Sequence, residues 1–354
     1  MESVEVVASS AIRRNSDEIV ARALELQFEM WPHMQAAFDD AQIAHTKQDT
    51  RFHLDFLASA LWAGEPVLFS DYARWTLTLF ENLGLPAEWL TGSIECIRDA
   101  IVELLEPQSA AVAERYIQPV LDGTCVGDEC ADESLIDAAS RHGGLAMRYL
   151  GAVIGAERQR ASQMILEAVD AGVPVSEVYL EVLQPVQMEL GRLWQINRIT
   201  VAQEHYATAV TQMVMSQLYA HIFSTEKNGR TMVAACVGGE LHEIGMRMVA
   251  DFFEMRGWDT HYVGANTPIK DIIETVALTR ANVLALSATM GFHIPEVAEV
   301  IAALRADERT VNTKVIVGGY PFILAPNLWQ RVGADGSAPD ASAALDLAER
   351  LVAA

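Results

Sequence analysis

Positive charge is scarce in this sequence of 354 residues. Its 25 lysines and arginines stand against 48 aspartates and glutamates, which gives a formal net charge of −23. A surface of this sign repels phosphate backbones and anionic lipid headgroups. The composition therefore argues against broad contact with nucleic acid or with acidic membranes, and we expect no direct DNA binding.

Cysteine and long apolar runs are rare as well. The four cysteines are Cys96, Cys125, Cys130 and Cys236, and Cys236 lies in an apolar segment where a free buried thiol is common. No uncleaved apolar run reaches about 18 residues. The acidic start MESVEVVASSAIRRNSDE lacks the charged-then-apolar order of a signal peptide. These absences predict a soluble protein of the reducing cytoplasm that has no membrane span.

Strand-like and helical patterns alternate in the last third of the chain. The apolar runs are TMVAACV, THYVGA, VLALSAT and KVIVGG, and a segment with helical periodicity follows each of them. Such alternation predicts a parallel sheet covered by helices on both faces, so residues 229–354 are expected to form a Rossmann-like, flavodoxin-like domain. Ligands of these domains bind at the carboxyl ends of the strands.

The first two thirds of the chain show helical patterns only. A chain of this length fits two or three domains, and residues 1–125 are expected to form a helical domain with helices from about residue 16 to 105. Residues 106–133 are polar towards their end and suggest a linker. Residues 126–228 are expected to form a four-helix bundle. Its predicted helices are 134–151, 157–171, 175–193 and 200–223. The predicted fold class is therefore multi-domain, α and α/β.

A histidine stands in the turn after the first predicted strand, within GGELHEIGMRMVADFF. His242 precedes a helix, so its ring is expected at the sheet edge where ligands bind. Glu240 can accept the other ring N–H, which would fix the tautomer and raise the basicity of a metal-bound nitrogen. Gly245 lets the start of the helix approach a large group. The spacing alone also suits an ordinary surface histidine.

Two other predicted strands end in small residues. Ser287 and Thr289 follow the third strand, and Gly318 and Gly319 follow the fourth. Each pair alone is common turn chemistry. Together they predict an open slot of hydroxyls and bare backbone beside His242, which suits a long ligand arm.

These three motifs resemble the cobalamin-binding domains, whose patterns are Asp-x-His-x-x-Gly, Ser-x-Leu/Thr and Gly-Gly. The resemblance implies that His242 is the lower axial ligand of cobalt and that Glu240 and Gly245 fill the flanking motif positions. It also implies a pocket for the nucleotide tail, lined by Ser287, Thr289, Gly318 and Gly319. Glu240 replaces the aspartate of most corrinoid methyltransferases and mutases, and in this it resembles the light-sensing cobalamin proteins.

The bundle contains Trp194 and, after nine further residues, the pair Glu204 and His205. A core tryptophan and a solvated Glu-His pair would explain these residues simply. In context, however, GRLWQINRITVAQEHYATA resembles the helical cap of CarH-type cobalamin photoreceptors. This resemblance implies that Trp194 packs on the adenosyl group of adenosylcobalamin, while Glu204 and His205 contact its hydroxyls or the cobalt site. Gln195 replaces the cobalt-coordinating histidine of the DNA-binding members, which excludes a bis-histidine light state through this residue.

The N-terminal segment differs from those DNA-binding members, which begin with a basic helix-turn-helix of the MerR kind. Its stretch TRFHLDFLASALWAGEPVLFSDYARWTLTLFENLGLPAEWL predicts consecutive helices joined by a GEP turn. It resembles a globin-like or phycocyanin-like sensor domain. A simple dimerisation core is an alternative, and so is a haem pocket in which His53 binds iron.

The whole arrangement resembles the photocobilins, which pair cobalamin with biliverdin. By this resemblance His53 lies near the pyrrole nitrogens or lactam of biliverdin, Arg74 pairs with a propionate, and Tyr72 and Trp75 line the pocket. Attachment of the bilin through Cys125 or Cys130 is a weaker alternative, because both lie in the predicted linker.

These resemblances predict a light sensor without enzymatic activity. Light would break the cobalt–carbon bond of adenosylcobalamin, and the cap would repack. A chain that binds no DNA would signal by association, so we expect a homo-oligomer with a light-dependent state and an unidentified protein partner. The nearest alternative is a corrinoid carrier protein for methyl transfer, which shares the cap and the sheet.

Overall fold

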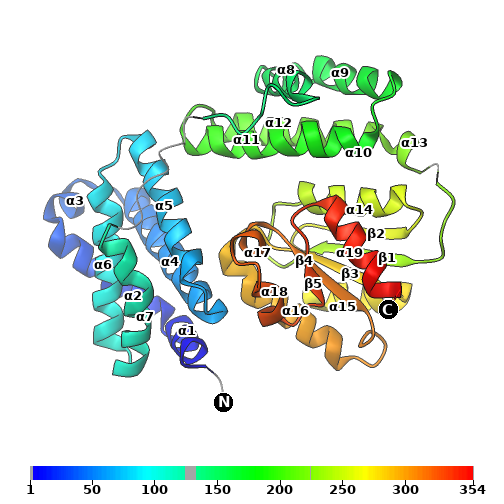
Figure 1. Cartoon of the computed structure of the whole chain (residues 1–354). Coiled ribbons are helices and arrows are strands. Elements are labelled where there is room, and N and C mark those ends of the chain that lie inside the picture. Colours follow the sequence, from blue (N-terminus) through cyan, green and yellow to red (C-terminus); the bar gives the residue numbers. More distant parts are fainter. Residues whose placement is uncertain (1–2, 124–132, 224, 354) are drawn as a thin grey trace. The chain divides into compact units, whose positions relative to one another are not determined.

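The computed structural model describes residues 3–123, 133–223 and 225–353 (Figure 1). Cys125 and Cys130 lie outside these residues. None of the helices in the described residues is both long and apolar enough to cross a membrane. The chain divides into two compact units. The first comprises Met1–Asp128, Ala288–Ile301 and Gly319–Ala334, and the second comprises Glu129–Ser287, Ala302–Gly318 and Asp335–Ala354.

The N-terminal third of the described chain is entirely helical. Its longest helix, α4, begins at a capping box between Asp39 and Gln42 and ends at Gly64, which has a φ of 75°. Pro66 then opens α5, so the predicted GEP turn is confirmed. The helices are α1 (Val4–Arg14), α2 (Ser16–Met30), α3 (Pro32–Ala37), α4 (Asp40–Ala63), α5 (Pro66–Leu83), α6 (Ala87–Leu104) and α7 (Pro107–Leu121).

The linker predicted from residue 106 is wrong over most of its length, because α7 occupies it. Pro107 stands at the first helical position, where it costs no hydrogen bond. One face of α7 is buried against α1 and α6, including Ala113, Tyr116 and Ile117. This packing stabilises the helix, although its first residues, Pro107-Gln-Ser, are typical of a loop.

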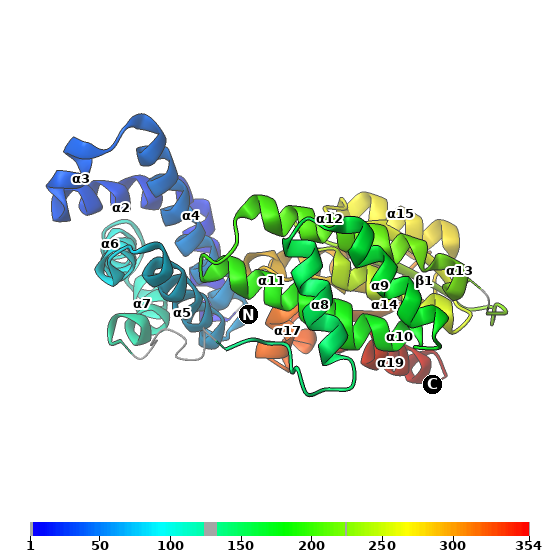
Figure 2. The same ribbon diagram turned by 90° about the horizontal axis from the view of Figure 1, so that it is seen from above.

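Residues 133–223 form the helical bundle, called the cap below. Figure 2 shows its main helices side by side. The first begins only at Gly143, because residues 133–142 form turns, and the predicted start at 134 is therefore wrong. The third predicted helix contains a π-helical turn, η1. The elements are α8 (Gly143–Ile154), α9 (Arg158–Asp170), α10 (Val175–Val178), η1 (Tyr179–Leu183), α11 (Gln184–Gln195), α12 (Val201–Gln217) and α13 (Tyr219–Ile222).

The C-terminal residues form a five-stranded parallel sheet with the order β2-β1-β3-β4-β5, which is the flavodoxin-like order. The strands are β1 (Thr231–Cys236), β2 (Asp259–Gly264), β3 (Val283–Ser287), β4 (Lys314–Gly318) and β5 (Gly336–Ser337). The connecting elements are α14 (Ile244–Met255), α15 (Ile269–Thr279), η2 (Gly291–His293), α16 (Ile294–Ala306), α17 (Tyr320–Leu324), α18 (Leu328–Val332) and α19 (Ala341–Ala353).

Both faces of the sheet are buried. Alternate residues such as Met232, Ala234 and Cys236 pack against α14 and α19, while α15 contacts β1 from the opposite face (Figure 1). The intervening residues, such as Val233 and Ala235, are fully buried as well. The predicted fold class of helical domain, four-helix cap and Rossmann-like sheet is therefore confirmed.

Candidate functional site

Three predicted site segments lie at the carboxyl ends of neighbouring strands. Cys236 of β1 pairs in register with Ser287 of β3, and Ser287 pairs with Gly318 of β4. The chain order reverses between β1 and β3, and this is where flavodoxin-like sheets bind ligands. The loop that follows Cys236 carries His242. The sequence therefore placed these motifs correctly along one edge of the sheet.

The imidazole of His242 is held by a buried carboxylate. Oε1 of Glu240 accepts hydrogen bonds from the backbone N–H of His242 at 2.9 Å and from its Nδ1 at 2.6 Å. The side chain of Glu240 is fully buried, whereas that of His242 is 58% exposed. Because Nδ1 donates its proton to Glu240, the lone pair of Nε2 is directed to the other side of the ring. This is the donor arrangement that an axial metal ligand requires.

The loop of His242 is fixed from the neighbouring strand. Asn266, which follows β2 and has a φ of 49°, accepts from the N–H of Gly239 at 2.7 Å and donates its own N–H to the carbonyl of Glu240 at 2.9 Å. The thiol of Cys236 lies 3.7 Å from the carbonyl oxygen of His242. The chain itself therefore preorganises the histidine.

The glycines of the site differ in the space around them. At Gly245 an added Cβ would meet no atom within 4 Å, so the first turn of α14 has open space above it. At Gly319, with a φ of 109°, an added Cβ would lie 2.0 Å from the carbonyl oxygen of Ala288. A side chain is excluded there by backbone strain and by contact. Ser287 is buried, and Thr289 follows it two residues beyond β3.

The cap motif lies where α11 joins α12. Trp194 is partly buried against the apolar core of the cap, next to Gln195 at the end of α11. Nδ1 of His205 lies 2.5 Å from Oε2 of Glu204, and the hydroxyl of Thr208 donates to Oε1 of Glu204 at 2.8 Å. His205 is 74% exposed. The structure thus brings Glu204 and His205 into contact and leaves the imidazole accessible.

Charge links the cap motif to His242. The hydrogen bond that His242 donates to Glu240 raises the pKa of His242, burial opposes this effect, and the negative charges of Glu240 and Glu204 add to the rise. Glu204 of the cap therefore acts electrostatically on His242 of the loop after β1.

Glu243 connects the cap and the sheet directly. Its Oε1 accepts from Nε2 of Gln212 in α12 at 2.7 Å, and its Oε2 accepts from the hydroxyl of Tyr262 in β2 at 2.7 Å. Glu243 was not among the predicted site residues. Its position directly after His242 was the one signal in the sequence that could have pointed to it. Its partners are 31 and 19 residues away along the chain and could not be paired from periodicity.

Further contacts fix the cap on α14. The guanidinium of Arg247 lies over the ring of Tyr219 and donates to its hydroxyl at 3.0 Å. The hydroxyl of Tyr179 in η1 donates to Asp251 at 2.8 Å. Phe252 of α14 belongs to the buried core of the cap. The junction therefore combines an apolar centre with a polar margin.

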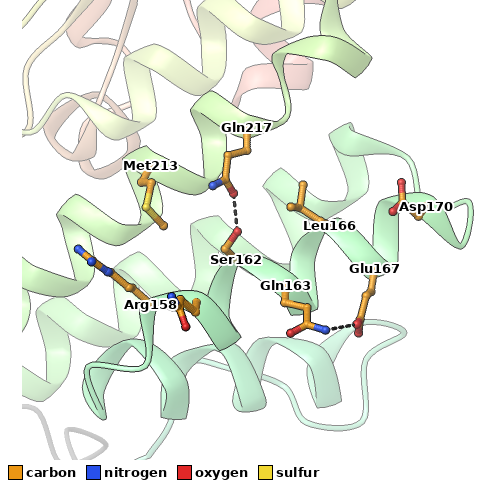
Figure 3. Close-up of a pocket in the computed structure, with 9 residues that line it drawn as sticks. Arg158, Ser162, Gln163, Leu166, Glu167, Asp170, Met213 and Gln217 are labelled. Atoms are coloured by element: carbon orange, nitrogen blue, oxygen red, sulfur yellow. Dashed lines mark hydrogen bonds between the residues drawn. The ribbon is translucent and has the colours of Figure 1, made fainter.

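A hollow of about 480 Å³ lies elsewhere on the cap, between α9 and α12 (Figure 3). Its polar rim contains a hydrogen bond from Ser162 to Gln217 and another from Gln163 to Glu167, the latter at 2.7 Å. None of the predicted site residues lines it. This hollow is therefore separate from the site around His242.

In the N-terminal helices, His53 of α4 and Tyr72 of α5 contact each other. Nδ1 of His53 lies 2.7 Å from the hydroxyl of Tyr72, and the ring of Phe56 stacks on Tyr72 with centroids 3.7 Å apart. Burial lowers the pKa of His53 to about 4 and raises the pKa of Tyr72. His53 is therefore a neutral, buried imidazole at neutral pH.

The other two predicted bilin residues are more exposed than this pair. Arg74 forms an ion pair with Asp71 on its own helix, and both Arg74 and Trp75 are exposed. Among the four predicted residues, His53 and Tyr72 are in direct contact.

Three separate parts of the chain match known protein families. Residues 145–219 and residues 230–346 each match a B12 binding domain family. Residues 2–123 match the phycobilisome protein family.

Individual relatives match part of the chain. Dimethylamine corrinoid protein 3 of Methanosarcina acetivorans is 28% identical over 214 residues, which are 59% of this chain and 97% of that protein. The HTH-type transcriptional repressor CarH of Myxococcus xanthus is 29% identical over 40% of this chain, but this chain spans less than half of its length, 46%.

The fold is also found among solved structures. The monomethylamine corrinoid protein of Methanosarcina barkeri aligns with a TM-score of 0.53 at 19% identity, over 59% of this chain and 99% of that one. Together with His242, Glu240 and the open space at Gly245, the matches show that the chain contains a cobalamin-binding module built from the cap and the sheet.

Proposed function

We propose that this protein is a light sensor that binds adenosylcobalamin in residues 145–346 and biliverdin in residues 2–123. One observation carries the proposal: a single chain joins a phycobilisome protein match to two B12 binding domain matches. The dimethylamine corrinoid protein is already covered to 97% by the match over 214 residues. That relative therefore has almost no length left for a counterpart of the N-terminal helices.

On the lower face, His242 would hold cobalt through Nε2 while Glu240 holds Nδ1. Gly245 leaves room for the corrin ring at the start of α14. The nucleotide tail would run along Ser287, Thr289, Gly318 and Gly319, where the small side chains leave backbone accessible. When bound, adenosylcobalamin would supply a cobalt–carbon bond that visible light can break.

On the upper face, the residues of the cap would respond to loss of the adenosyl group. Trp194 offers an apolar surface to that group, and Glu204 and His205 offer polar atoms to its hydroxyls. Gln195 cannot supply an imidazole, so His205 or solvent would take the upper face of cobalt after that loss. The side chain of His205 is 74% exposed and would have to leave its contact with Glu204.

In the N-terminal helices, biliverdin that reaches His53 would have to replace its contact with Tyr72. The neutral imidazole can donate one hydrogen bond and accept another, which suits the pyrrole and lactam groups of a bilin. Arg74 would leave Asp71 to pair with a propionate, and Trp75 would cover the edge of the pigment. Attachment through Cys125 or Cys130 is not needed for this binding mode.

The output of the proposed sensor is a change of association, with no catalysed reaction. The acidic surface opposes nucleic acid, and the cap is in contact with α14 through Glu243 and Arg247. Repacking around Trp194 would therefore change surfaces available to a second copy of the chain or to another protein. A differential affinity of a few kcal/mol between dark and light states is sufficient for a complete switch.

A second function, a corrinoid carrier for methyl transfer, is favoured by the dimethylamine corrinoid relatives. It uses the same His242 site but assigns no role to residues 2–123. The two functions therefore differ in the pigment of the N-terminal helices and in the upper ligand of cobalt.

Absorption spectra of the full chain, purified in darkness from cells that supply both pigments, test the proposal. We expect adenosylcobalamin bands together with a red bilin band. Green light should change the cobalamin bands and the elution volume in size-exclusion chromatography. His242→Ala should bind cobalamin more weakly or without its lower nitrogen ligand, while the bilin band stays unchanged.

Other outcomes would replace the proposal. Methylcobalamin without a bilin band would favour the carrier, and a Soret band would favour a haem protein. Constant elution over a wide concentration range, with photolysis confirmed by absorbance, would contradict a signal through association.

A further inference from the structure

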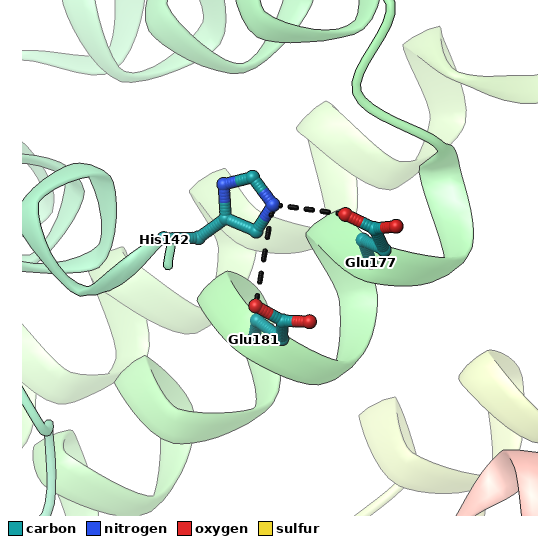
Figure 4. Close-up of side chains that lie close together, drawn as sticks. All are labelled: His142, Glu177 and Glu181. Carbon is teal, nitrogen blue, oxygen red and sulfur yellow. Dashed lines mark hydrogen bonds and ion pairs between the residues drawn. The ribbon is translucent and has the colours of Figure 1, made fainter. Parts of the chain in front are cut away.

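Three side chains able to bind a metal converge in the cap, and none of them belongs to the cobalamin site. His142 lies directly before α8, Glu177 lies in α10, and Glu181 lies in η1. One donor atom from each lies within 4.8 Å of the others. Figure 4 shows the imidazole pointing towards both carboxylates.

The imidazole of His142 lies near more acceptor atoms than its single N–H can bind. Nε2 of His142 is 3.0 Å from Oε2 of Glu177, which satisfies its one N–H, yet it is also 4.0 Å from Oε2 of Glu181. Tetrahedral ligands about 2.1 Å from a metal lie roughly 3.4 Å apart. The two separations between histidine and glutamate lie on either side of this value, and the donor oxygens of the two glutamates lie within 4.8 Å of each other. A metal could be accommodated by side-chain shifts of up to roughly 1.4 Å.

The donor set selects the type of metal. One imidazole with two carboxylates is a mixed nitrogen and oxygen set that suits Zn²⁺ and related transition metals. Mg²⁺ prefers oxygen ligands in a near-ideal octahedron and is disfavoured by the imidazole. His142 is 11% exposed, and both glutamates are partly exposed. The site would thus keep one open position for water.

The backbone around Glu181 is unusual in a way that is independent of the side-chain distances. Tyr179–Leu183 form a π-helical turn, closed by the N–H of Gln184 and the carbonyl of Tyr179. Such turns are rare in proteins, and those that occur are often found at functional sites. Tyr179, Val182 and Leu183 are fully buried, so the turn is anchored from inside while Glu181 stays on its outer side beside Glu177.

We propose that His142, Glu177 and Glu181 form a binding site for Zn²⁺ or a similar divalent transition metal, which ties the segment before α8 to the π-helical turn. This turn also carries Tyr179, whose hydroxyl binds Asp251 of α14. The metal would therefore stabilise the element through which the cap contacts the sheet domain. The proposal does not depend on the pigment of the N-terminal helices.

A neighbouring arginine allows a test in which metal binding should become stronger and not weaker. Nη1 of Arg141 lies 2.8 Å from Oε2 of Glu177, the same oxygen that His142 contacts, and its side chain is 69% exposed. The guanidinium competes with a metal for this carboxylate. Removing its charge should therefore strengthen metal binding, whereas a simple hydrogen-bonded ion pair predicts no such gain.

Zn²⁺ affinity of the cobalamin-loaded full chain can be measured by competition with a chromophoric chelator. We expect one site that is weakened at least tenfold by Glu181→Gln and by His142→Ala, and strengthened several-fold by Arg141→Gln. Glu181→Gln keeps the contact between His142 and Glu177 and is nearly isosteric, so the fold should persist. Excess Mg²⁺ should not displace Zn²⁺.

The matched control is Glu157→Gln, which removes another partly exposed cap carboxylate, one that pairs with Arg160 at 2.7 Å. Its Zn²⁺ affinity should equal that of the parent. Zn²⁺ should also raise the melting temperature of the parent and of Glu157→Gln, and raise it less in Glu181→Gln. Equal affinities in the parent, Glu181→Gln and Arg141→Gln would overturn the proposal and leave an ordinary ion-pair cluster.

Discussion

Asp251 is a buried carboxylate at the junction of the cap and α14, and replacing it should stabilise the protein at high pH. Burial raises the pKa of Asp251 from 3.8 to about 6, while the hydroxyl of Tyr179 and the charge of Arg247 oppose this rise. Glu254 adds to it. Asp251→Asn keeps an oxygen acceptor for Tyr179 and removes the charge.

The sign of the effect follows from proton binding. Between pH 3.8 and 6 the folded state binds more protons than the unfolded state, so the free energy of unfolding falls as pH rises through this window. Above pH 6 the raised pKa lowers the free energy of unfolding by roughly 3 kcal/mol. The new amide N–H₂ needs partners and costs about 1 kcal/mol. Asp251→Asn should therefore stabilise by roughly 2 kcal/mol at pH 8 and give no gain at pH 4.

Hydrogen exchange of peptides from α14, measured at both pH values under native conditions, reports this local stability without assuming that the whole chain unfolds in one step. Tyr179→Phe is the opposing variant. It removes the donor to Asp251 and should destabilise by about 1–3 kcal/mol at pH 8, with a smaller effect at pH 4. A stability difference between Asp251→Asn and the parent that is the same at pH 4 and pH 8 would refute the assignment of a raised pKa.

Four further substitutions test the cobalamin site and the N-terminal helices. Gly319→Ala should destabilise the protein by more than 3 kcal/mol in thermal unfolding, because its Cβ would meet Ala288 and φ is unfavourable. Gly245→Ala should leave the melting temperature unchanged and weaken cobalamin binding. Tight cobalamin binding by Gly245→Ala would contradict a corrin ring at this position. Trp194→Ala should reduce the preference for adenosylcobalamin over hydroxocobalamin at least tenfold in equilibrium titrations, and an unchanged preference would make this side chain part of the core alone. His53 has a pKa lowered to about 4, so the N-terminal helices should lose stability as pH falls below 6.5, by about 2 kcal/mol at pH 4.5; hydrogen exchange of α4 should show that His53→Phe lacks this loss, and an equal loss in the variant would place its cause elsewhere.

Strands β1 and β3 were predictable because they are buried on both faces. TMVAACV and VLALSAT are continuous apolar runs, and β1 and β3 lie within one or two residues of them. β5 was missed because Gly336–Ser337 contains no apolar run and pairs only through its backbone with β4. α7 was missed because local sequence suggested a linker and only tertiary packing fixes the helix.

The site was predictable in its separate motifs, since His242, Ser287 and Gly318 each follow a strand. The contacts between distant segments were not. Periodicity cannot reveal that Gln212 reaches Glu243 or that His142 reaches Glu177, because these depend on how helices pack. The π-helical turn at Tyr179–Leu183 also leaves no mark in a pattern that treats residues 175–193 as one helix.

The two hydrogen bonds of Glu243 connect the loop after β1 both to the cap and to the sheet. One carboxylate, adjacent to His242, is bound at the same time to Gln212 of the cap and to Tyr262 of the sheet. A displacement of this backbone stretches one of the two bonds or carries its partner along. β2 is anchored by its ladder with β1, so we expect α12 to be the partner that moves. In the proposed cobalamin complex, a displacement of the His242 loop would thereby be transmitted to the cap through Glu243.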